Sequence, residues 1–303
     1  MNESHADHRP KVGRWKRGWL TVKAAWKVFK LDKELSVFAF LGGLFALVIA
    51  GVGFGISIWV APGHTFDSQH LGHAPATIAV WIATAILLSC VATYSAAAII
   101  GGALMRFRGQ NPTVKDGFRA VKRRWGSLTL FAIMNAGIGQ ALKAIEDRLP
   151  WLGGRIVAYI VDVAWAVASL MAIPVIVDCK EPVSPVKAVK QSVGIIKKAW
   201  GEVAVSNIGV GFIFLILVVL ELVGGTIITI ASASVTGNAT LPAITGLLTF
   251  FALVATLILS SVLSAIIKAG IYHYATTGET PEHFDHELMK AAFSPKKARR
   301  LFV

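Results

Sequence analysis

Charged residues are scarce in this sequence of 303 residues. Asp, Glu, Lys and Arg together make up 16% of it, hydrophobic residues make up 55%, and the mean hydropathy is +0.64. Soluble globular domains carry about 25% charged residues. The shortage of charge therefore excludes an ordinary soluble domain and predicts a chain that lies in lipid.

Cysteine is also rare, since the chain has only Cys90 and Cys179. Cys90 lies inside a hydrophobic run, whereas Cys179 follows the end of another. Two thiols at such different depths in a membrane argue against a disulfide bond, which needs closely spaced backbone positions. We interpret both residues as small buried apolar side chains.

Acidic residues are outnumbered by basic residues, 17 to 30, which gives a net charge of +13. The basic residues are not spread evenly. Of the 30, 27 lie in the two terminal segments, in the segments that follow the second and fourth hydrophobic runs, or, for Lys268, near the end of the sixth run. The segments on the opposite side of the membrane contain only Lys143, Arg148 and Arg155. By the positive-inside rule, both termini are cytoplasmic. This distribution indicates membrane topology, so we expect no nucleic-acid partner.

Six apolar runs are long enough to cross a hydrocarbon core of about 30 Å as helices. They are continuous, whereas the strands of a membrane barrel alternate and are short. We therefore predict an all-α, polytopic transmembrane helical bundle. The predicted domains are a disordered tail at 1–9, a membrane domain at 10–280 and an amphipathic basic tail at 281–303. The six spans are expected near 35–60, 76–105, 128–145, 156–177, 203–230 and 243–274.

A basic amphipathic motif precedes the first, third and fifth runs. In its clearest copy Val114, Phe118, Val121 and Trp125 form one helical stripe, with Lys and Arg on the flank. Interfacial helices have this pattern, because apolar side chains enter the lipid while cations stay at the phosphates. The pattern predicts three hairpin repeats, each preceded by an interfacial helix. The predicted headgroup and interface residues are Lys16, Lys23, Lys27, Lys115, Arg119, Lys122, Arg123, Lys187, Lys190, Lys197, Lys198, Trp26, Trp125 and Trp200.

Five polar residues lie within the apolar runs: Asn135, Gln140, Asp162, Asn207 and Glu221. Amides in membrane helices commonly hydrogen-bond to neighbouring helices. Ionisable groups in such helices often mark an ion or substrate route. We place Asp162 and Glu221 near the outer interface, where solvation or pairing with Arg148 or Arg155 is available. The five residues form the candidate polar route.

Residues for catalysis or metal binding do not converge. The loop at 61–75 contains His64, His70 and His73 beside Asp67, but their spacing matches no closed structural zinc site. Histidine is otherwise almost missing from the runs, so no general base stands beside a nucleophile. We expect no enzymatic activity, no cofactor and no metal.

Several short motifs carry a family resemblance: Asp32-Lys33-Glu34-Leu35, residues 106–113 (RFRGQNPT), Ala164-Trp165 with Pro174, and residues 197–202 (KKAWGE). Through them the chain resembles an uncharacterised family of bacterial and archaeal integral membrane proteins with six spans, a domain of unknown function. The resemblance implies a multi-pass protein of the prokaryotic cytoplasmic (inner) membrane. It brings no catalytic or binding residue.

Two functions fit these observations. The first is a non-enzymatic membrane module that binds anionic lipid headgroups or a membrane protein partner through a basic cytoplasmic collar. The alternative is a small-solute or ion transporter or channel that uses the polar route. The sequence leaves open whether the chain forms a homo-oligomer.

Overall fold

The computed structural model describes residues 14–60, 75–148, 152–198, 203–236, 240–284 and 286. The predicted tail at 1–9 and most of the tail at 281–303 therefore lie outside the described residues. Every element in the described residues is a helix. The helices are α1 (Arg14–Leu31), α2 (Leu35–Val60), α4 (Pro75–Phe107), α5 (Val114–Arg148), α6 (Leu152–Ser169), α7 (Ala172–Asp178), α8 (Pro185–Lys198), α9 (Val203–Thr236) and α10 (Thr240–Thr277).

Five segments of the described chain are long and apolar enough to cross a membrane: Leu35–Val60, Pro75–Phe107, Arg155–Asp178, Ile213–Ser234 and Thr240–Thr277. The predicted helical class and membrane character are thus confirmed. The sixth expected span, 128–145, is the second part of α5 and is not among these five segments.

The second interfacial helix and the third expected span are one continuous helix rather than two. α5 runs from Val114 to Arg148 and is only kinked at Arg124, whose φ and ψ are −123° and 16°. Continuing the helix through Gly126 keeps the backbone N–H and C=O groups paired, whereas a break would leave four of each without helical partners. The motif therefore bends the chain without ending the helix.

The fourth expected span is divided into α6 and α7 by a turn at Leu170 and Met171. Pro174 explains the break, because proline has no N–H for the carbonyl four residues earlier, which belongs to Leu170. The N–H of Met171 instead donates to the hydroxyl of Ser192 on α8, at 3.0 Å. This buried bond attaches α8 to the break.

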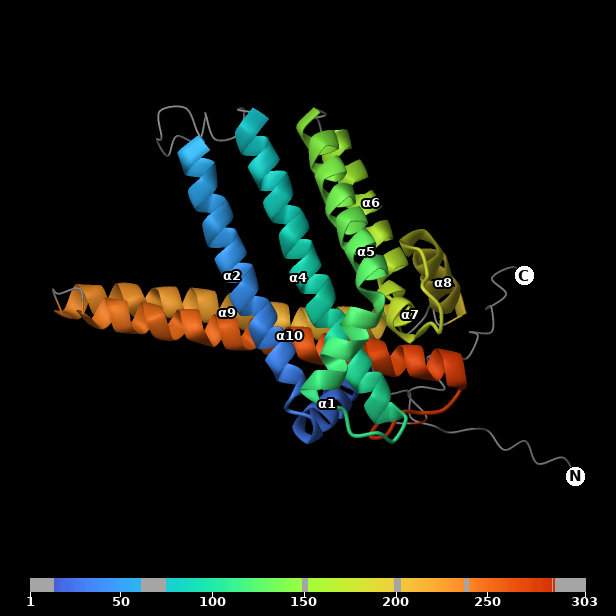
Figure 1. The fold of residues 1–303 in the computed structure, drawn as a ribbon. Helices are drawn as coiled ribbons and strands as arrows, with labels where there is room; N and C mark the ends of the chain where they lie inside the picture. The colour runs from blue at the N-terminus through green and yellow to red at the C-terminus, as the bar shows by residue number, and fades with distance from the viewer. Residues whose placement is uncertain are drawn as a thin grey trace, which may run out of the picture.

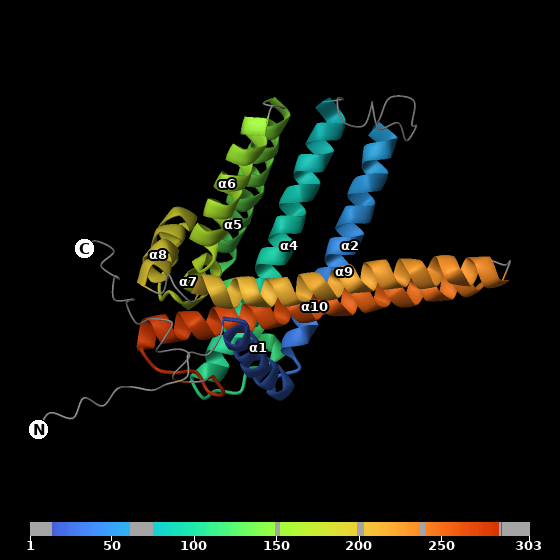
Figure 2. The ribbon, with the colours of Figure 1, turned by 180° about the vertical axis from the view of Figure 1, so that it is seen from behind.

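The long helices form two groups that cross each other. Figures 1 and 2 show α2, α4, α5 and α6 side by side, while the hairpin of α9 and α10 lies across their lower ends. α9 packs along α10, and both helices also pack against α1. The hairpin is therefore not a third parallel member of the bundle, and the threefold repeat stays a prediction.

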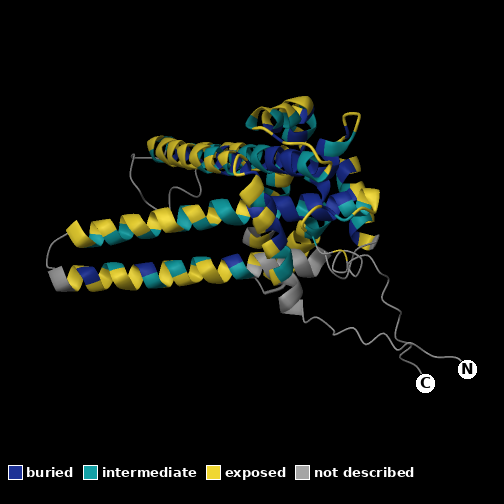
Figure 3. Cartoon of the chain, turned by 90° about the horizontal axis from the view of Figure 1, so that it is seen from below, coloured by how far each residue is buried: buried dark blue, intermediate teal, exposed yellow. Residues whose placement is uncertain are grey.

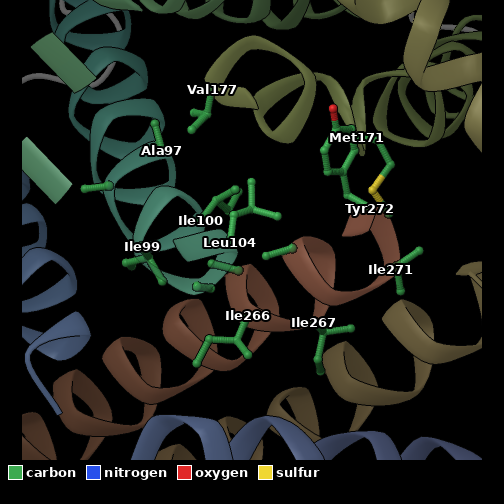
Figure 4. Close-up of a cluster of buried hydrophobic side chains, with 14 of the residues drawn as sticks. Ala97, Ile99, Ile100, Leu104, Met171, Val177, Ile266, Ile267, Ile271 and Tyr272 are labelled. Carbon is green, nitrogen blue, oxygen red and sulfur yellow. The ribbon is translucent and has the colours of Figure 1, made fainter. Parts of the chain in front are cut away.

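The hydrophobic core lies where the two groups cross. It is formed by the ends of α2 and α4, by α7 and by the second half of α10, which Figure 3 shows as a block of buried residues. Ile100, Leu104, Val175 and Ile266 are all at most 2% exposed. Figure 4 shows side chains of α4, α7 and α10 converging there. Away from this basal core, the long helices expose apolar side chains.

Candidate functional site

The basic residues predicted for lipid contact lie on α1, on the first part of α5 and on α8. Those with described side chains are all exposed. We call this set the basic collar: Lys23, Lys27, Lys115, Arg119, Lys122, Arg123, Lys187, Lys190 and Lys197. Lys16, Lys198 and Trp200 were also predicted, but their side chains lie outside the described residues.

Tryptophan rings accompany the lysines of the collar. Trp26 is 37% exposed and Trp125 is 66% exposed. The Nζ atom of Lys23 is 5.8 Å from the centre of the Trp19 ring, and that of Lys30 is 5.7 Å from the Trp26 ring. These are cation–π distances, so each ammonium group stays beside an exposed amphipathic ring. Membrane-interface helices combine aromatic and cationic groups in this way.

Some arginines of the same motif contact other parts of the chain. Arg119 forms an ion pair with Asp116 at 2.6 Å, and Arg123 donates to the Val177 carbonyl at 3.2 Å. Arg124 is buried, and its guanidinium donates to the Cys179 carbonyl. Carbonyl groups at the end of a helix lack helical partners, so the two neighbouring arginines cap α7. Arg124 was not among the predicted headgroup residues, and its capping role was not predicted either, because that role depends on a contact with a segment 55 residues away.

A buried ion pair joins the first two helices to α4. Asp32, between α1 and α2, is 4% exposed and receives two hydrogen bonds from Arg106 near the end of α4; the Nε–Oδ2 distance is 2.5 Å. Arg106 also donates to Asn111 at 2.6 Å. Bidentate arginine–carboxylate pairs fix geometry as well as charge. We call the basal core and the segments that connect its helices the base of the protein. Residues of the motifs that carried the family resemblance therefore hold this base together.

Two further carboxylates organise the start of α5. Glu34 accepts a hydrogen bond from the backbone N–H of Val114 at 3.0 Å. Asp116 accepts from the Thr113 hydroxyl at 2.7 Å and from the Thr113 N–H at 3.1 Å, and the second bond is the carboxylate half of a capping box. The hydrogen bond from the Thr113 hydroxyl, followed by that from its N–H, lowers the pKa of Asp116. α5 therefore begins at a well-defined place beside α2.

A third ion pair at the base involves Arg108 and Asp178, which connect the ends of α4 and α7. Next to it, burial raises the pKa of the Cys179 thiol. A raised pKa keeps the thiol protonated and unreactive. Cys90 and Cys179 are both free, in agreement with the absence of a disulfide predicted from their depths.

The polar-route residues on α5 and α6 lie near one another. Asn135 accepts a hydrogen bond from the indole N–H of Trp165 at 2.9 Å. Gln140 is half-buried one turn further along α5. Asp162 lines a pocket of about 640 Å³ with Lys143, Glu146 and Arg155. In that pocket Arg155 pairs with Glu146 at 3.4 Å. The Asp162 side chain is exposed, which fits solvation, the other possibility given for it.

The other polar-route residues belong to α9. Glu221 accepts a hydrogen bond from the Thr256 hydroxyl of α10 at 2.6 Å, and its second carboxyl oxygen is buried with no partner among the described residues. α9 continues 15 residues beyond Glu221, about 22 Å, so this residue lies near the middle of an apolar segment and not at its outer end. The side chain of Asn207 lies outside the described residues. The structure thus divides the route between two helix pairs.

An apolar groove runs between α2, α4 and α10 and was not predicted. Its volume is about 780 Å³. Its walls include Gly43 and Leu47 on α2, Val91 on α4, and Phe251 and Val254 on α10. The groove joins segments that are far apart in the chain, so no sequence motif marks it. The run of small residues on α2 was the only available signal.

Metal ligands do not gather in the described part of the chain, where no group of three or more His, Cys, Asp or Glu side chains could hold an ion. The loop with His64, His70 and His73 lies outside the described residues. His283 approaches Glu282 at 3.6 Å, and His286 bonds to the Thr280 hydroxyl at 2.7 Å.

Five apolar helical segments with a basic, tryptophan-bearing collar define a protein of the multi-pass membrane class. The chain belongs to a family of unknown function, DUF6159, whose model matches residues 75–282. The match confirms the expected membership of a domain-of-unknown-function family. No curated protein matches this chain.

Proposed function

We propose that this protein is a non-enzymatic module of the prokaryotic cytoplasmic membrane that binds anionic lipids through its basic collar. The exposure of all nine collar side chains is the observation that carries the proposal. Arg119 and Arg123 of the collar also contact protein, but the seven collar lysines are exposed, whereas Arg124, which caps α7, is buried. Lipid phosphates are the anions that such helices meet at a membrane surface.

The proposed topology follows the charge distribution. Six spans, with 128–145 as the third, form three hairpins, and both termini are cytoplasmic. The collar then faces the inner leaflet, which is rich in anionic lipid. Each Lys or Arg near such a surface contributes about 1 kcal/mol of attraction, which salt reduces. The seven collar lysines together support tight retention of lipid.

Lipid retention tests the proposal. The protein is reconstituted in nanodiscs of phosphatidylglycerol and phosphatidylcholine, extracted, and its bound lipids are counted by native mass spectrometry. A variant with Lys23, Lys27, Lys115 and Lys122 changed to Gln should lose most of its preference for phosphatidylglycerol. The matched control changes Lys143 and Arg155 to Gln at the far end of α5 and α6, and should retain lipid as the wild type does.

Equal phosphatidylglycerol retention by the collar variant and the control would overturn lipid binding by the collar. If the collar variant instead loses a co-purified acidic protein or a second copy of the chain, the collar binds protein, and the lipid proposal is also overturned. The salt dependence of lipid retention is an independent test, because a headgroup interaction should weaken as ionic strength rises.

A transporter or channel is the second candidate, and Glu221 favours it. A carboxyl group with one unpaired oxygen in the middle of an apolar helix is unusual for a purely structural residue. Under this hypothesis, proteoliposomes should dissipate an ion gradient, and Glu221→Gln should stop the flux. Equal flux from wild type, Glu221→Gln and empty vesicles would remove this candidate.

A further inference from the structure

We propose that the groove between α2, α4 and α10 binds one acyl chain of a membrane phospholipid. The inference rests on the proposed lipid-binding function and adds a site for the hydrophobic part of the lipid. No basic residue of the collar lines this groove, so its contribution is separable from headgroup binding.

The chemistry of the walls fits a hydrocarbon chain. Among the lining residues only Ser95 and Ser261 carry a polar side chain, and the rest are Gly, Ala, Val, Leu, Ile or Phe. The Ser261 hydroxyl is already used, since it donates to the Ile258 carbonyl of its own helix at 2.8 Å. A polar ligand would lose hydrogen bonds to water without replacing them, whereas an apolar chain loses none.

The dimensions also fit. The groove follows α2 from Ala39 to Ala50, twelve residues that span about 16 Å at the rise of an α-helix. One leaflet accounts for about half of the roughly 30 Å hydrocarbon core. The groove is therefore about as long as the space that one acyl chain crosses. Its volume of about 780 Å³ is within the usual range of ligand sites.

Small residues create the groove and large ones form its rims. An added Cβ at Gly43 would meet no atom within 4 Å, so open space begins at the α2 backbone. Phe40 and Leu44 on α2, and Phe251 and Leu257 on α10, remain exposed. A chain in the groove covers these rims, and burial of apolar surface is the driving force.

Positive charge near one end of the groove favours a phospholipid as its occupant. Lys33 is exposed in the turn before α2, six residues before the groove begins at Ala39. Lys30 is also exposed, at the end of α1. A chain that enters the groove from this end leaves its phosphate beside these two cations.

Two glycines on α2 provide a matched test. Gly43 lines the groove and Gly51 does not, and an added Cβ meets no atom within 4 Å at either position. Gly43→Phe therefore fills the groove, while Gly51→Phe adds the same side chain to an open face of the same helix. Both proteins, in nanodiscs, are irradiated with a phosphatidylglycerol that carries a diazirine at the end of one acyl chain. The labelled peptides are then identified.

Wild type and Gly51→Phe should be labelled on the groove segments of α2 and α10. Gly43→Phe should show about tenfold less labelling there, the change expected if two methylene groups no longer fit. Ala50→Phe, at the other end of the groove, should also reduce labelling. Equal labelling of Gly43→Phe and Gly51→Phe, or labelling confined to other helices, would overturn the groove.

The outcomes for the groove and for the collar are distinguishable. The collar variant should lose its preference for phosphatidylglycerol over phosphatidylcholine but keep groove labelling when the lipid is in excess. If Gly43→Phe and Gly51→Phe are labelled equally while the collar variant loses this preference, the proposed function stands without the groove. If groove labelling follows the expected pattern while the collar variant keeps its headgroup preference, the collar proposal fails instead.

Discussion

The two halves of α10 have similar composition but different surroundings. From Val262 to His273 nearly every residue is buried in the basal core, whereas Leu247, Leu248, Phe251 and Leu257 are exposed. Its partner α9 is more exposed still, since only Phe214, Gly225 and Ser232 are buried within the segment Ile213–Ser234. Apolar composition therefore does not tell whether a helix packs on protein or faces lipid.

Polar contacts show the same difference between the base and the hairpin. The base contains the Asp32–Arg106 and Arg108–Asp178 ion pairs together with the arginine caps of α7. The described part of the α9–α10 hairpin has hydroxyl contacts and the single carboxyl of Glu221. The base thus has the features of a water-soluble core, and the hairpin has those of helices in lipid. Substitutions at the base and in the hairpin should therefore differ in their effect on stability.

Asp32→Ala should cause the largest loss of stability. It leaves the partly buried Arg106 guanidinium without its carboxylate, and breaking a buried pair from one side costs up to about 3–5 kcal/mol. The free energy of unfolding in detergent micelles measures the effect. Arg155→Gln breaks the exposed pair with Glu146 and should change stability by less than about 1 kcal/mol. Similar losses of unfolding free energy from both variants would contradict the conclusion that the ion pair at the base is packed inside the protein.

Gly53→Ala should come next. An added Cβ at Gly53 would lie 2.3 Å from the Thr84 hydroxyl oxygen, so α2 and α4 must separate, at a cost of about 1–3 kcal/mol. At Gly51, two residues earlier, the same Cβ meets no atom within 4 Å, and helix propensity should make Gly51→Ala neutral or stabilising by up to about 1 kcal/mol. Thermal unfolding of the two variants should move in opposite directions. Equal shifts would show that α2 does not pack on α4 at Gly53.

Thr256→Val should have a smaller effect in the hairpin. It removes the only hydrogen bond that the Glu221 carboxyl makes among the described residues, and such contacts in membranes are worth about 0.6–2 kcal/mol. Thr256→Ser keeps the hydroxyl and should restore stability. No difference between the two variants in unfolding would mean that the carboxyl finds another partner in the bilayer.

Asp116 should give the weakest effect, visible only in acid. Its pKa is lowered in the folded protein, so its contribution is present above the ordinary aspartate value of 3.8 and is lost as the pH falls through the lower, folded value. Thr113→Val removes the hydroxyl bond and should reduce this acid-dependent loss. Thermal midpoints of both proteins between about pH 6 and about pH 2 measure it, since the loss begins near 3.8 and continues below that value. An identical pH dependence would exclude the Thr113 hydroxyl bond as its source.

Much of the fold could be predicted because the bilayer imposes simple lengths. Continuous apolar runs located four of the candidate segments to within a few residues, and the basic motif correctly placed exposed lysines on α1, α5 and α8. The division at Pro174 was also visible in the sequence. These features depend on short-range periodicity and on proline, which sequence alone reveals.

Other features depend on contacts between distant segments. No local pattern shows that Arg124 caps α7, that Asp32 pairs with Arg106 across 74 residues, or that α9 continues far beyond Glu221. The position of Glu221 was wrong because its depth was counted from Val203 across a span of about 30 Å, whereas α9 continues to Thr236 and leaves 15 residues beyond Glu221. The groove was missed for the same reason as the ion pairs: its walls meet only in the folded chain.

The depth of the collar in a bilayer tests the account most directly. A spin label is attached at Lys122→Cys or at Asn135→Cys, each in a background in which Cys90 and Cys179 are replaced by Ala. Accessibility to oxygen and to a water-soluble nickel complex is then measured in phosphatidylglycerol nanodiscs. The account predicts that position 122 lies at the headgroups and position 135 in the hydrocarbon. A label at position 122 that is as accessible to nickel as free label in water would contradict it.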